Sequence, residues 1–88
     1  MKINIRAKDF EVTDSIKSYV KEKASKLNKY INKEDMEVNV VLSGNKNNAY
    51  ITEFTLNTGA LYIRAEEKNP DLYATIDFSL SFISSISS

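Results

Sequence analysis

The segment "AYITEFTLNTGALYIRAEE" (residues 49–67) has the pattern of two β-strands joined by a tight turn, and it decides the fold of this 88-residue chain. Between residues 50 and 56, every second side chain belongs to one face, and this period of two is typical of a half-buried strand. Gly59 follows, and glycine accepts the left-handed backbone that tight turns require. The alternation resumes over residues 61–67, so the segment predicts an antiparallel hairpin.

Upstream, the segment "MEVNVVLSG" (residues 36–44) predicts a third strand of the same kind. Val38, Val40 and Leu42 alternate with more polar neighbours. The connection "GNKNN" (residues 44–48) is rich in residues that tolerate left-handed backbone, which favours a hairpin loop. Residues 36–67 therefore predict an antiparallel meander of three strands.

Before the meander, the sequence predicts one strand and one helix. "KINIRAK" (residues 2–8) alternates strictly, as a half-buried strand does. Thr13 is placed to cap a helix, with Asp14 in its first turn. Apolar residues then recur at helical spacing as far as residue 31, which predicts an amphipathic helix of about five turns.

After the meander, the sequence predicts a second helix, with Asn69 as its cap and Pro70 at its first position. Ile76, Leu80 and Ile83 form its inward stripe. Its end, "FSLSFISSISS" (residues 78–88), is rich in serine, and serine competes for backbone hydrogen bonds. We therefore expect the helix to fray beyond about Ile83.

The order strand, helix, three strands, helix predicts one domain over residues 1–88. The economical packing is a two-layer α+β fold, with order β-α-β-β-β-α and both helices on one face of a four-stranded sheet. The first strand, which is connected through a helix, can pair in parallel with a neighbour by a right-handed crossover.

Composition excludes several classes of protein. The chain has no cysteine and no histidine, which excludes disulfide scaffolds and zinc modules and removes the commonest nucleophile and base pairs. Four carboxylates near the second helix lack the glycine-bearing loop of a calcium site: Glu66, Glu67, Asp71 and Asp77. We expect no enzyme, cofactor, metal or small-molecule substrate. Because no segment reads as a signal peptide or membrane span, we expect no membrane partner and a cytoplasmic protein.

Charge is unevenly distributed although the net charge is zero. Residues 1–33 carry nine basic and four acidic side chains, whereas residues 34–88 carry three and eight. The predicted first helix has Glu22 as its single mid-helix acid and holds five of the ten lysines: Lys17, Lys21, Lys23, Lys26 and Lys29. These lysines are typical either of a phosphate-binding ridge or of a merely solvated helix face, and a helix built only for solubility usually mixes both signs.

Several stretches together resemble the ribosome hibernation-promoting factor family, also called ribosome-associated translation inhibitors. They are "MKINIR", "EVTDSIKSYVKEKASKLNKY", "VNVVL" and "LYIRAEEKNPDLYATID", so the likeness spans residues 1 to about 77. The resemblance implies a fold like that of double-stranded-RNA-binding domains. It also implies binding to the small ribosomal subunit at the decoding region, where the protein grips ribosomal RNA phosphates and occludes messenger and transfer RNA. Carried onto this chain, the RNA-facing positions are Lys17, Lys21, Lys26 and Lys29, with Arg6, Lys8 and Arg64 as weaker candidates.

The serine-rich end, residues 78–88, departs from the family pattern. In the family the last helix carries several lysines and arginines, which form the second rail of an RNA-binding groove, and here it supplies no cation after residue 77. Phe78 and Phe82 are instead expected to be exposed, and exposed apolar patches invite association. The alternative function is therefore a protein-interaction domain with lost or weakened ribosome binding, such as a homodimer formed through these two residues.

Overall fold

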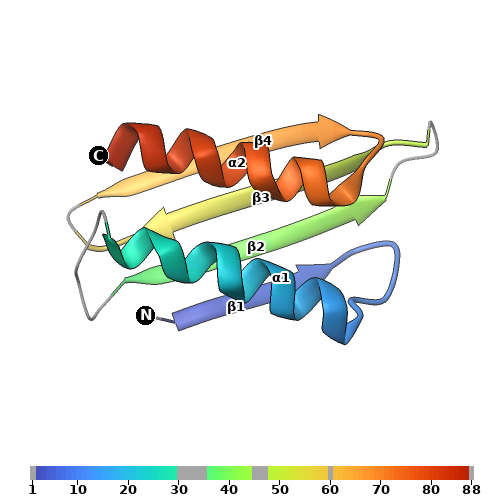
Figure 1. Cartoon of the computed structure of the whole chain (residues 1–88), viewed down its shortest axis with the longest axis horizontal. Helices are drawn as coiled ribbons and strands as arrows, with labels where there is room; N and C mark the ends of the chain where they lie inside the picture. Colours follow the sequence, from blue (N-terminus) through green and yellow to red (C-terminus); the bar gives the residue numbers. More distant parts are fainter. Residues whose placement is uncertain (1, 30–35, 45–47, 60, 88) are drawn as a thin grey trace.

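The computed structural model of the chain describes residues 2–29, 36–44, 48–59 and 61–87 and places them in two layers (Figure 1). Both helices lie on one face of a four-stranded sheet, as predicted. None of the helices in these ranges is long and apolar enough to cross a membrane. The elements are β1 (Lys2–Ala7), α1 (Asp14–Ser25), the 3-10 helix η1 (Lys26–Lys29), β2 (Glu37–Gly44), β3 (Tyr50–Asn57), β4 (Tyr62–Asn69) and α2 (Leu72–Ser87).

The sheet has the strand order β1-β2-β3-β4. β1 pairs in parallel with β2, with Ile3 beside Val38, which confirms the crossover expected for a strand connected through a helix. β2, β3 and β4 form the predicted antiparallel meander. Gly59 adopts a φ of 89° in the turn before β4, so the left-handed conformation expected at this glycine is present. β1 and β4 are the two edge strands.

The core lies between the helices and one face of the sheet. Burial alternates along β2, β3 and β4, as the period-two patterns predicted. Both helices contribute an apolar stripe at the spacing of one helical face. The largest of the side chains that are less than 2% exposed are Phe54, Leu27, Met36, Leu42, Leu56, Ile76 and Ile83.

The first helix begins as predicted and ends earlier. The backbone N–H of Ile16 donates to Thr13 Oγ1 at 3.2 Å, which is the expected N-cap hydrogen bond. The α-helix ends at Ser25, where the N–H of Lys26 donates to the carbonyl of Lys23, the bond that begins a 3-10 turn. The prediction of five α-helical turns is therefore wrong within the described residues, and its last residues, 30 and 31, lie outside them.

The second helix begins later than predicted. β4 continues to Asn69, which pairs with Tyr50, so this residue is still in the sheet. Asp71 caps α2 instead, because its Oδ1 accepts from the N–H of Tyr73 at 3.0 Å and its carbonyl accepts from Thr75. Asn69 Oδ1 accepts from the N–H of Asp71 at 2.9 Å, as a capping side chain does, but α2 begins only at Leu72. The predicted start, with Asn69 as the cap and Pro70 at the first helical position, is therefore wrong.

The second helix also ends later than predicted, at Ser87. Ser79 Oγ donates to the carbonyl of Ile76 at 3.0 Å, and Ser85 Oγ donates to that of Phe82 at 2.8 Å. These hydroxyls find acceptors within the helix, and buried Ile83 holds its last turns on the sheet. The helix end expected near Ile83 is therefore wrong.

Candidate nucleic-acid interface

The outer surface of α1 and η1 carries lysine side chains that point into solvent. Ile16, Val20 and Ala24 are buried against the sheet, and this stripe fixes which side of the helix faces outward. The side chains of Lys17, Lys21 and Lys26 are exposed, as the sequence predicted. Within the described ranges, no carboxylate oxygen lies within 4.0 Å of these three ammonium groups; the described ion pairs involve only Lys23 and Arg64.

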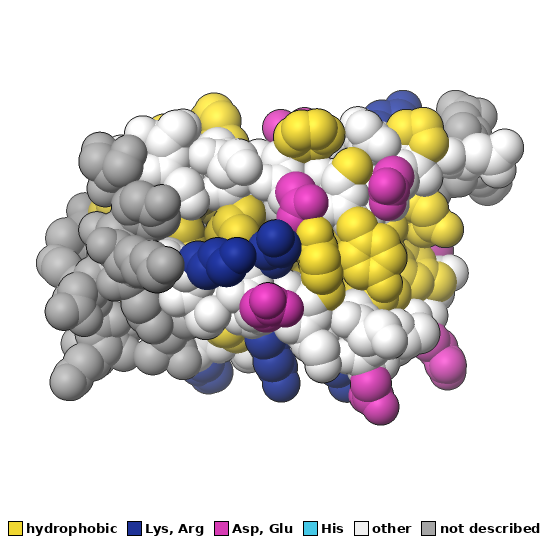
Figure 2. Space-filling model, in the orientation of Figure 1, with side chains coloured by type: hydrophobic (Ala, Val, Ile, Leu, Met, Phe, Trp, Pro, Cys, Tyr) yellow, Lys and Arg dark blue, Asp and Glu magenta, His cyan; other side chains and the backbone are white. Residues whose placement is uncertain are grey.

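The lysines occupy two flanks of the helix. At 100° per residue, Lys17 and Lys21 lie on the flank that faces away from α2, whereas Lys23 and Lys26 lie on the flank that faces it. Figure 2 shows this division, with basic side chains near the middle of the helix-covered face and others at its margin on the β1 side. A single helix therefore presents cations toward the groove between the helices and toward the outside.

A shallow groove runs between the two helices beside these cations. It is lined by Lys23 and Lys26 from the first helix and its 3-10 extension, and by Asp77, Leu80, Ser81 and Ser84 from α2. Ser81 and Ser84 therefore occupy the wall opposite Lys26, and α2 contains no lysine or arginine. Among the described residues that line the groove, both cations therefore lie on the wall formed by the first helix and its 3-10 extension.

A polar cluster fixes the two helices to each other at this groove. Tyr19 Oη donates to Asp77 Oδ1 at 2.6 Å, and Lys23 Nζ lies 4.0 Å from the same oxygen. Lys23 Nζ also lies 5.4 Å from the centroid of the Tyr19 ring. The Tyr19 and Tyr73 rings pack in a T-shaped arrangement, with their centroids 4.8 Å apart. The hydrogen bond to Asp77, with partial burial, raises the pKa of Tyr19 to about 12, because ionisation would set a phenolate against a carboxylate.

The sequence did not predict this cluster of Tyr19, Lys23, Tyr73 and Asp77. Tyr19 and Asp77 lie 58 positions apart, and only the packing of α1 against α2 brings them together. The one available signal was the position of Tyr19 on the flank of the apolar stripe, where a tyrosine can bury its ring and keep a polar tip at the rim. Lys23 is thereby partly neutralised, which distinguishes it from the exposed lysines nearby.

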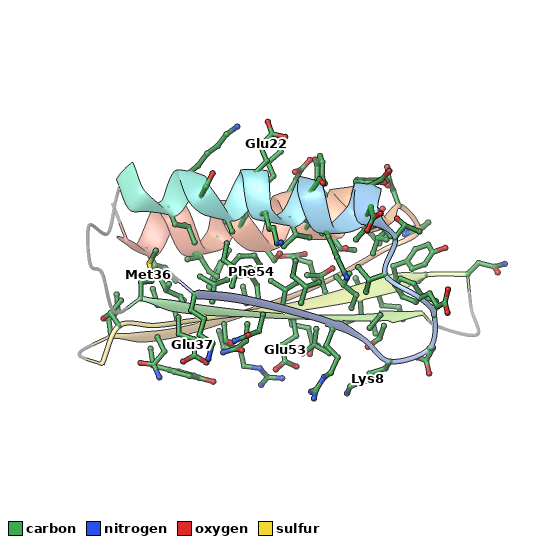
Figure 3. The ribbon with its side chains drawn as sticks, turned by 90° about the horizontal axis from the view of Figure 1, so that it is seen from below. Lys8, Glu22, Met36, Glu37, Glu53 and Phe54 are labelled. Atoms are coloured by element: carbon green, nitrogen blue, oxygen red, sulfur yellow. The ribbon has the colours of Figure 1, made fainter. Side chains whose placement is uncertain are left out.

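The weaker candidates lie on the opposite face of the molecule. Seen from the edge of the sheet, Lys8, Glu37 and Glu53 project from the face that the helices leave open (Figure 3). Arg6 and Arg64 alternate with core-facing residues of β1 and β4, so they share this open face. The structure therefore separates Arg6, Lys8 and Arg64 from Lys17, Lys21 and Lys26 by the thickness of the domain.

Arg64 differs from the exposed lysines because it has two carboxylate partners. Its Nη2 lies 3.0 Å from Glu53 Oε2 and 3.5 Å from Glu66 Oε2. The hydrogen bond to Glu53 and the charges of both glutamates raise the pKa of Arg64, which stays ionised in any case. Lys29 belongs to η1 by its backbone, but its side chain lies outside the described part of the chain, so its place in the interface stays a prediction.

The chemistry of this surface suits anions. Lysine ammonium groups are compact charges that bind phosphate oxygens, and lysines in the absence of nearby acids keep that charge available. In the described ranges, no group of three or more histidine, cysteine, aspartate or glutamate side chains could hold a metal ion.

Comparison with known proteins places these features in a family. A family model described as "Sigma 54 modulation protein / S30EA ribosomal protein" matches residues 3–82. The proteins named ribosome hibernation promotion factor from Lactococcus lactis and Staphylococcus aureus are 38% and 36% identical over 79 and 78 residues. These alignments cover 89% and 88% of the chain but 43% and 41% of the relatives, so the chain spans less than half the length of these proteins.

Two solved structures share the fold. The crystal structure of the Thermus thermophilus Protein Y N-terminal domain superposes with a TM-score of 0.91 at 30% identity, and the match covers 99% of this chain and 96% of that one. A ribosomal subunit interface protein from Coxiella burnetii superposes with a TM-score of 0.86 at 14% identity, covering 99% and 93% of the two chains. The second likeness concerns the fold alone. The predicted α+β fold class is confirmed.

Proposed function

Because the chain belongs to the Sigma 54 modulation protein / S30EA ribosomal protein family, we propose that it is a cytoplasmic, ribosome-associated hibernation factor. Residues 1–88 act as one ribosome-binding unit on the small subunit. The unit holds ribosomal RNA phosphates at the decoding region and occludes messenger and transfer RNA without a catalytic step. The names of the relatives from Lactococcus lactis and Staphylococcus aureus support the association with ribosome hibernation.

One observation supports the RNA-binding surface above all others. Lys17, Lys21 and Lys26 are exposed, and no described carboxylate neutralises them. When a lysine without an acidic partner binds a phosphate, it releases counterions from the nucleic acid, and this release favours binding at low salt. We place the primary contact on the helix-covered face and expect Lys29 to contribute to it, whereas Arg64 already has Glu53 and Glu66 as partners.

The α2 wall of the groove makes binding weaker than it would be with cations on both walls. Ser81 and Ser84 offer hydroxyls where a phosphate would meet a second row of charge. Each phosphate contact adds roughly 0.7 to 0.9 to the slope of log affinity against log salt. A surface with few such contacts has a shallow slope and gains little from counterion release, so we expect the proposed complex to be weak already at low salt.

The test is co-sedimentation of the chain with small ribosomal subunits over a range of salt concentrations. Three double variants each remove two positive charges, so they have the same net charge. Lys17→Ala/Lys21→Ala alters the exposed flank of α1, and Arg6→Ala/Lys8→Ala alters the open face of the sheet. Lys2→Ala/Lys68→Ala is the matched control, because these two lysines belong to neither predicted set.

The α1 variant is expected to lower affinity about ten-fold near 0.1 M salt and to reduce the salt slope by about 1.5, since two contacts are lost. The control is expected to bind nearly as the unchanged chain does. Equal losses in all three variants would mean that only net charge matters. A loss confined to the Arg6 and Lys8 variant would move the contact to the open face, and either result would overturn the proposed interface.

A further inference from the structure

One margin of the molecule combines the outer edge of the sheet with exposed apolar side chains. β4 is an edge strand, and α2 lies over β3 and β4 (Figure 1). On α2, Phe78, Phe82 and Ile86 are spaced four residues apart and are 54%, 47% and 50% exposed. Side chains at this spacing form one continuous stripe along a helix. Tyr62, at the start of β4, is 65% exposed.

The stripe lies on the side of α2 that faces the β4 edge. Tyr73 and Asp77 contact Tyr19 of α1, and Ser84 lines the groove between the helices, so these residues mark the opposite flank. At 100° per residue, Phe82 and Ile86 point away from that flank. Figure 2 shows hydrophobic side chains along the upper margin, where Figure 1 places β4. The apolar stripe and the open strand edge therefore adjoin.

The two edges of the sheet differ in charge. On its open face β1 carries Lys2 and Arg6, so antiparallel pairing of β1 with a second β1 in the register centred on Asn4, which uses nearly the whole strand, would set cations against each other. On the same face β4 carries Arg64, Glu66 and Lys68, which alternate in sign. The β1 edge thus disfavours a copy of itself in that register. The β4 edge can set opposite charges against each other in the registers centred on Ala65 and on Glu67, and the first of these pairs more of the strand.

We propose that the β4 edge and the α2 stripe bind a second copy of this chain about a two-fold axis through Ala65. In this register Ala65 lies opposite its own copy, and Arg64 lies opposite Glu66 of the second copy, twice. Neighbouring registers set Arg64 against Arg64 or Glu66 against Glu66. The register centred on Ala65 pairs opposite charges and also uses residues 62–68, nearly the whole strand.

The same axis brings the two apolar stripes together. Neighbouring strands are about 4.8 Å apart, and α2 packs on both β3 and β4, so its axis is about 5 Å from the two-fold axis. The two copies of α2 are then separated by about 10 Å, at the upper end of the 8–10 Å spacing of packed helices. Phe78, Phe82 and Ile86 of each copy fill this space. A single two-fold axis therefore pairs the two β4 edges and also packs the two exposed α2 stripes against each other.

Dimerisation through this edge leaves the first helix free. α1 lies over the β1 side of the sheet, at the far margin from β4 (Figure 1). Lys17 and Lys21 remain exposed in both copies, so the dimer does not depend on the proposed ribosome binding, and either can fail alone. The interface is small, so we expect weak, concentration-dependent association.

The test is sedimentation equilibrium of the chain from micromolar to millimolar concentration. Glu66→Arg and Arg64→Glu each place like charges opposite each other twice and are expected to weaken the dimer about ten-fold. The double variant Arg64→Glu/Glu66→Arg restores opposite charges and is expected to dimerise as the unchanged chain does. Phe82→Ser is expected to weaken the dimer by a similar factor, and Lys2→Glu, on the other edge, is the control.

Recovery of dimerisation in the double variant would show that Arg64 of one copy lies opposite Glu66 of the other. A chain that stays monomeric at millimolar concentration overturns the proposal. Dimers that survive both single reversals, or a double variant no better than either single one, overturn it as well, because the contact would then lie elsewhere. Binding of a different protein to this edge, with the isolated chain monomeric, counts equally against it.

Disulfide trapping gives a second measurement that does not rely on charge repulsion. The chain has no cysteine, so Arg64→Cys and Glu66→Cys can be made in separate chains and mixed under mild oxidation. Directly opposite residues have Cβ atoms about 4.5–5.5 Å apart, whereas diagonal neighbours are about 7–8 Å apart. The mixed 64–66 dimer is therefore expected to form ahead of the 64–64 and 66–66 dimers, and equal yields of the three would exclude this register.

Discussion

The two helices cover the same face of the same sheet, yet their outer surfaces differ in kind. α1 and η1 present Lys17, Lys21 and Lys26, whereas α2 contains no lysine or arginine at all. Instead α2 exposes Phe78, Phe82 and Ile86 along one stripe and serines around it. The fold constrains only the inward stripe of each helix, so the outward sides are free to carry different functions. We propose that the cationic side binds nucleic acid and that the apolar side binds a second copy of the chain.

The inward sides differ as well. α1 buries only apolar residues, Ile16, Val20 and Ala24, whereas α2 buries Thr75 and Ser79 among its apolar ones. Thr75 Oγ1 donates to the carbonyl of Leu72 at 2.5 Å and lies 2.6 Å from Thr52 Oγ1 of β3. Since Thr75 has a single hydroxyl proton, Thr52 is the donor of the second bond. A buried polar link therefore joins α2 to the sheet.

Of the changes considered, loss of the hydrogen bond between Thr52 and Thr75 is expected to have the largest effect on stability. Thr75→Val removes the acceptor of the Thr52 hydroxyl and leaves a buried donor unsatisfied, which costs about 1–3 kcal/mol of unfolding free energy. Thr52→Val removes only a donor and is expected to cost less. The double variant leaves no unpaired hydroxyl and is expected to be more stable than Thr75→Val alone.

Urea unfolding of the four proteins measures these free energies. Ser79→Ala is the matched control on the same helix face, because among the described residues its hydroxyl bonds only to the carbonyl of Ile76. Strictly additive costs of the two threonine changes would contradict the geometry described above.

Positive charge added to α2 would make its groove wall resemble that of α1. Ser81→Lys/Ser84→Lys places two cations on the wall of the groove opposite Lys26. If phosphates enter this groove, affinity for small ribosomal subunits is expected to rise about ten-fold near 0.1 M salt, because each added contact steepens the salt dependence. The measurement is the same co-sedimentation series.

The control for that gain is a pair of lysines placed away from the groove. Ser15 and Ser18 are exposed on the outer side of α1, so Ser15→Lys/Ser18→Lys adds the same charge there. Equal gains from both pairs would show that the groove has no special part in binding.

The sequence predicted the fold because each element carried its own periodicity. The alternation in residues 50–56 and the helical stripes depend on burial alone, which any packing of two layers must respect. The start of α2 was mispredicted because the decisive interaction, Asn69 beside Tyr50, depends on the register of a strand pair. Boundaries are decided by such tertiary contacts, whereas element types are decided locally.

The candidate site was predicted in part for the same reason. That Lys17 and Lys21 are exposed follows from their angle to the apolar stripe, which the sequence contains. That Arg64 meets Glu53, and that Asp77 meets Tyr19, requires two elements to be placed against each other. The sequence alone therefore identified the cations but could not tell which of them already have partners.

The smallest expected effect concerns the contact where the two helices meet. Tyr19 donates to Asp77, and this bond raises the pKa of Tyr19 from 10.0 to about 12. A group whose pKa is raised by folding stabilises the protein fully below its unfolded pKa, and that contribution is lost as pH rises through the folded pKa. The contribution is therefore complete below about pH 10 and disappears toward pH 12.

Tyr19→Phe is accordingly expected to cost about 1 kcal/mol at pH 8, the usual value of one hydrogen bond. The difference from the unchanged chain is expected to shrink by pH 11, where the phenol of the unfolded chain ionises. Urea unfolding at both pH values measures it, and tyrosinate absorbance reports the late-titrating phenol directly. Asp77→Asn keeps an acceptor but removes the charge, so it should lower the pKa of Tyr19 without removing the bond. Parallel loss of stability by the unchanged chain and Tyr19→Phe between pH 8 and pH 11 would mean that this bond does not join the two helices.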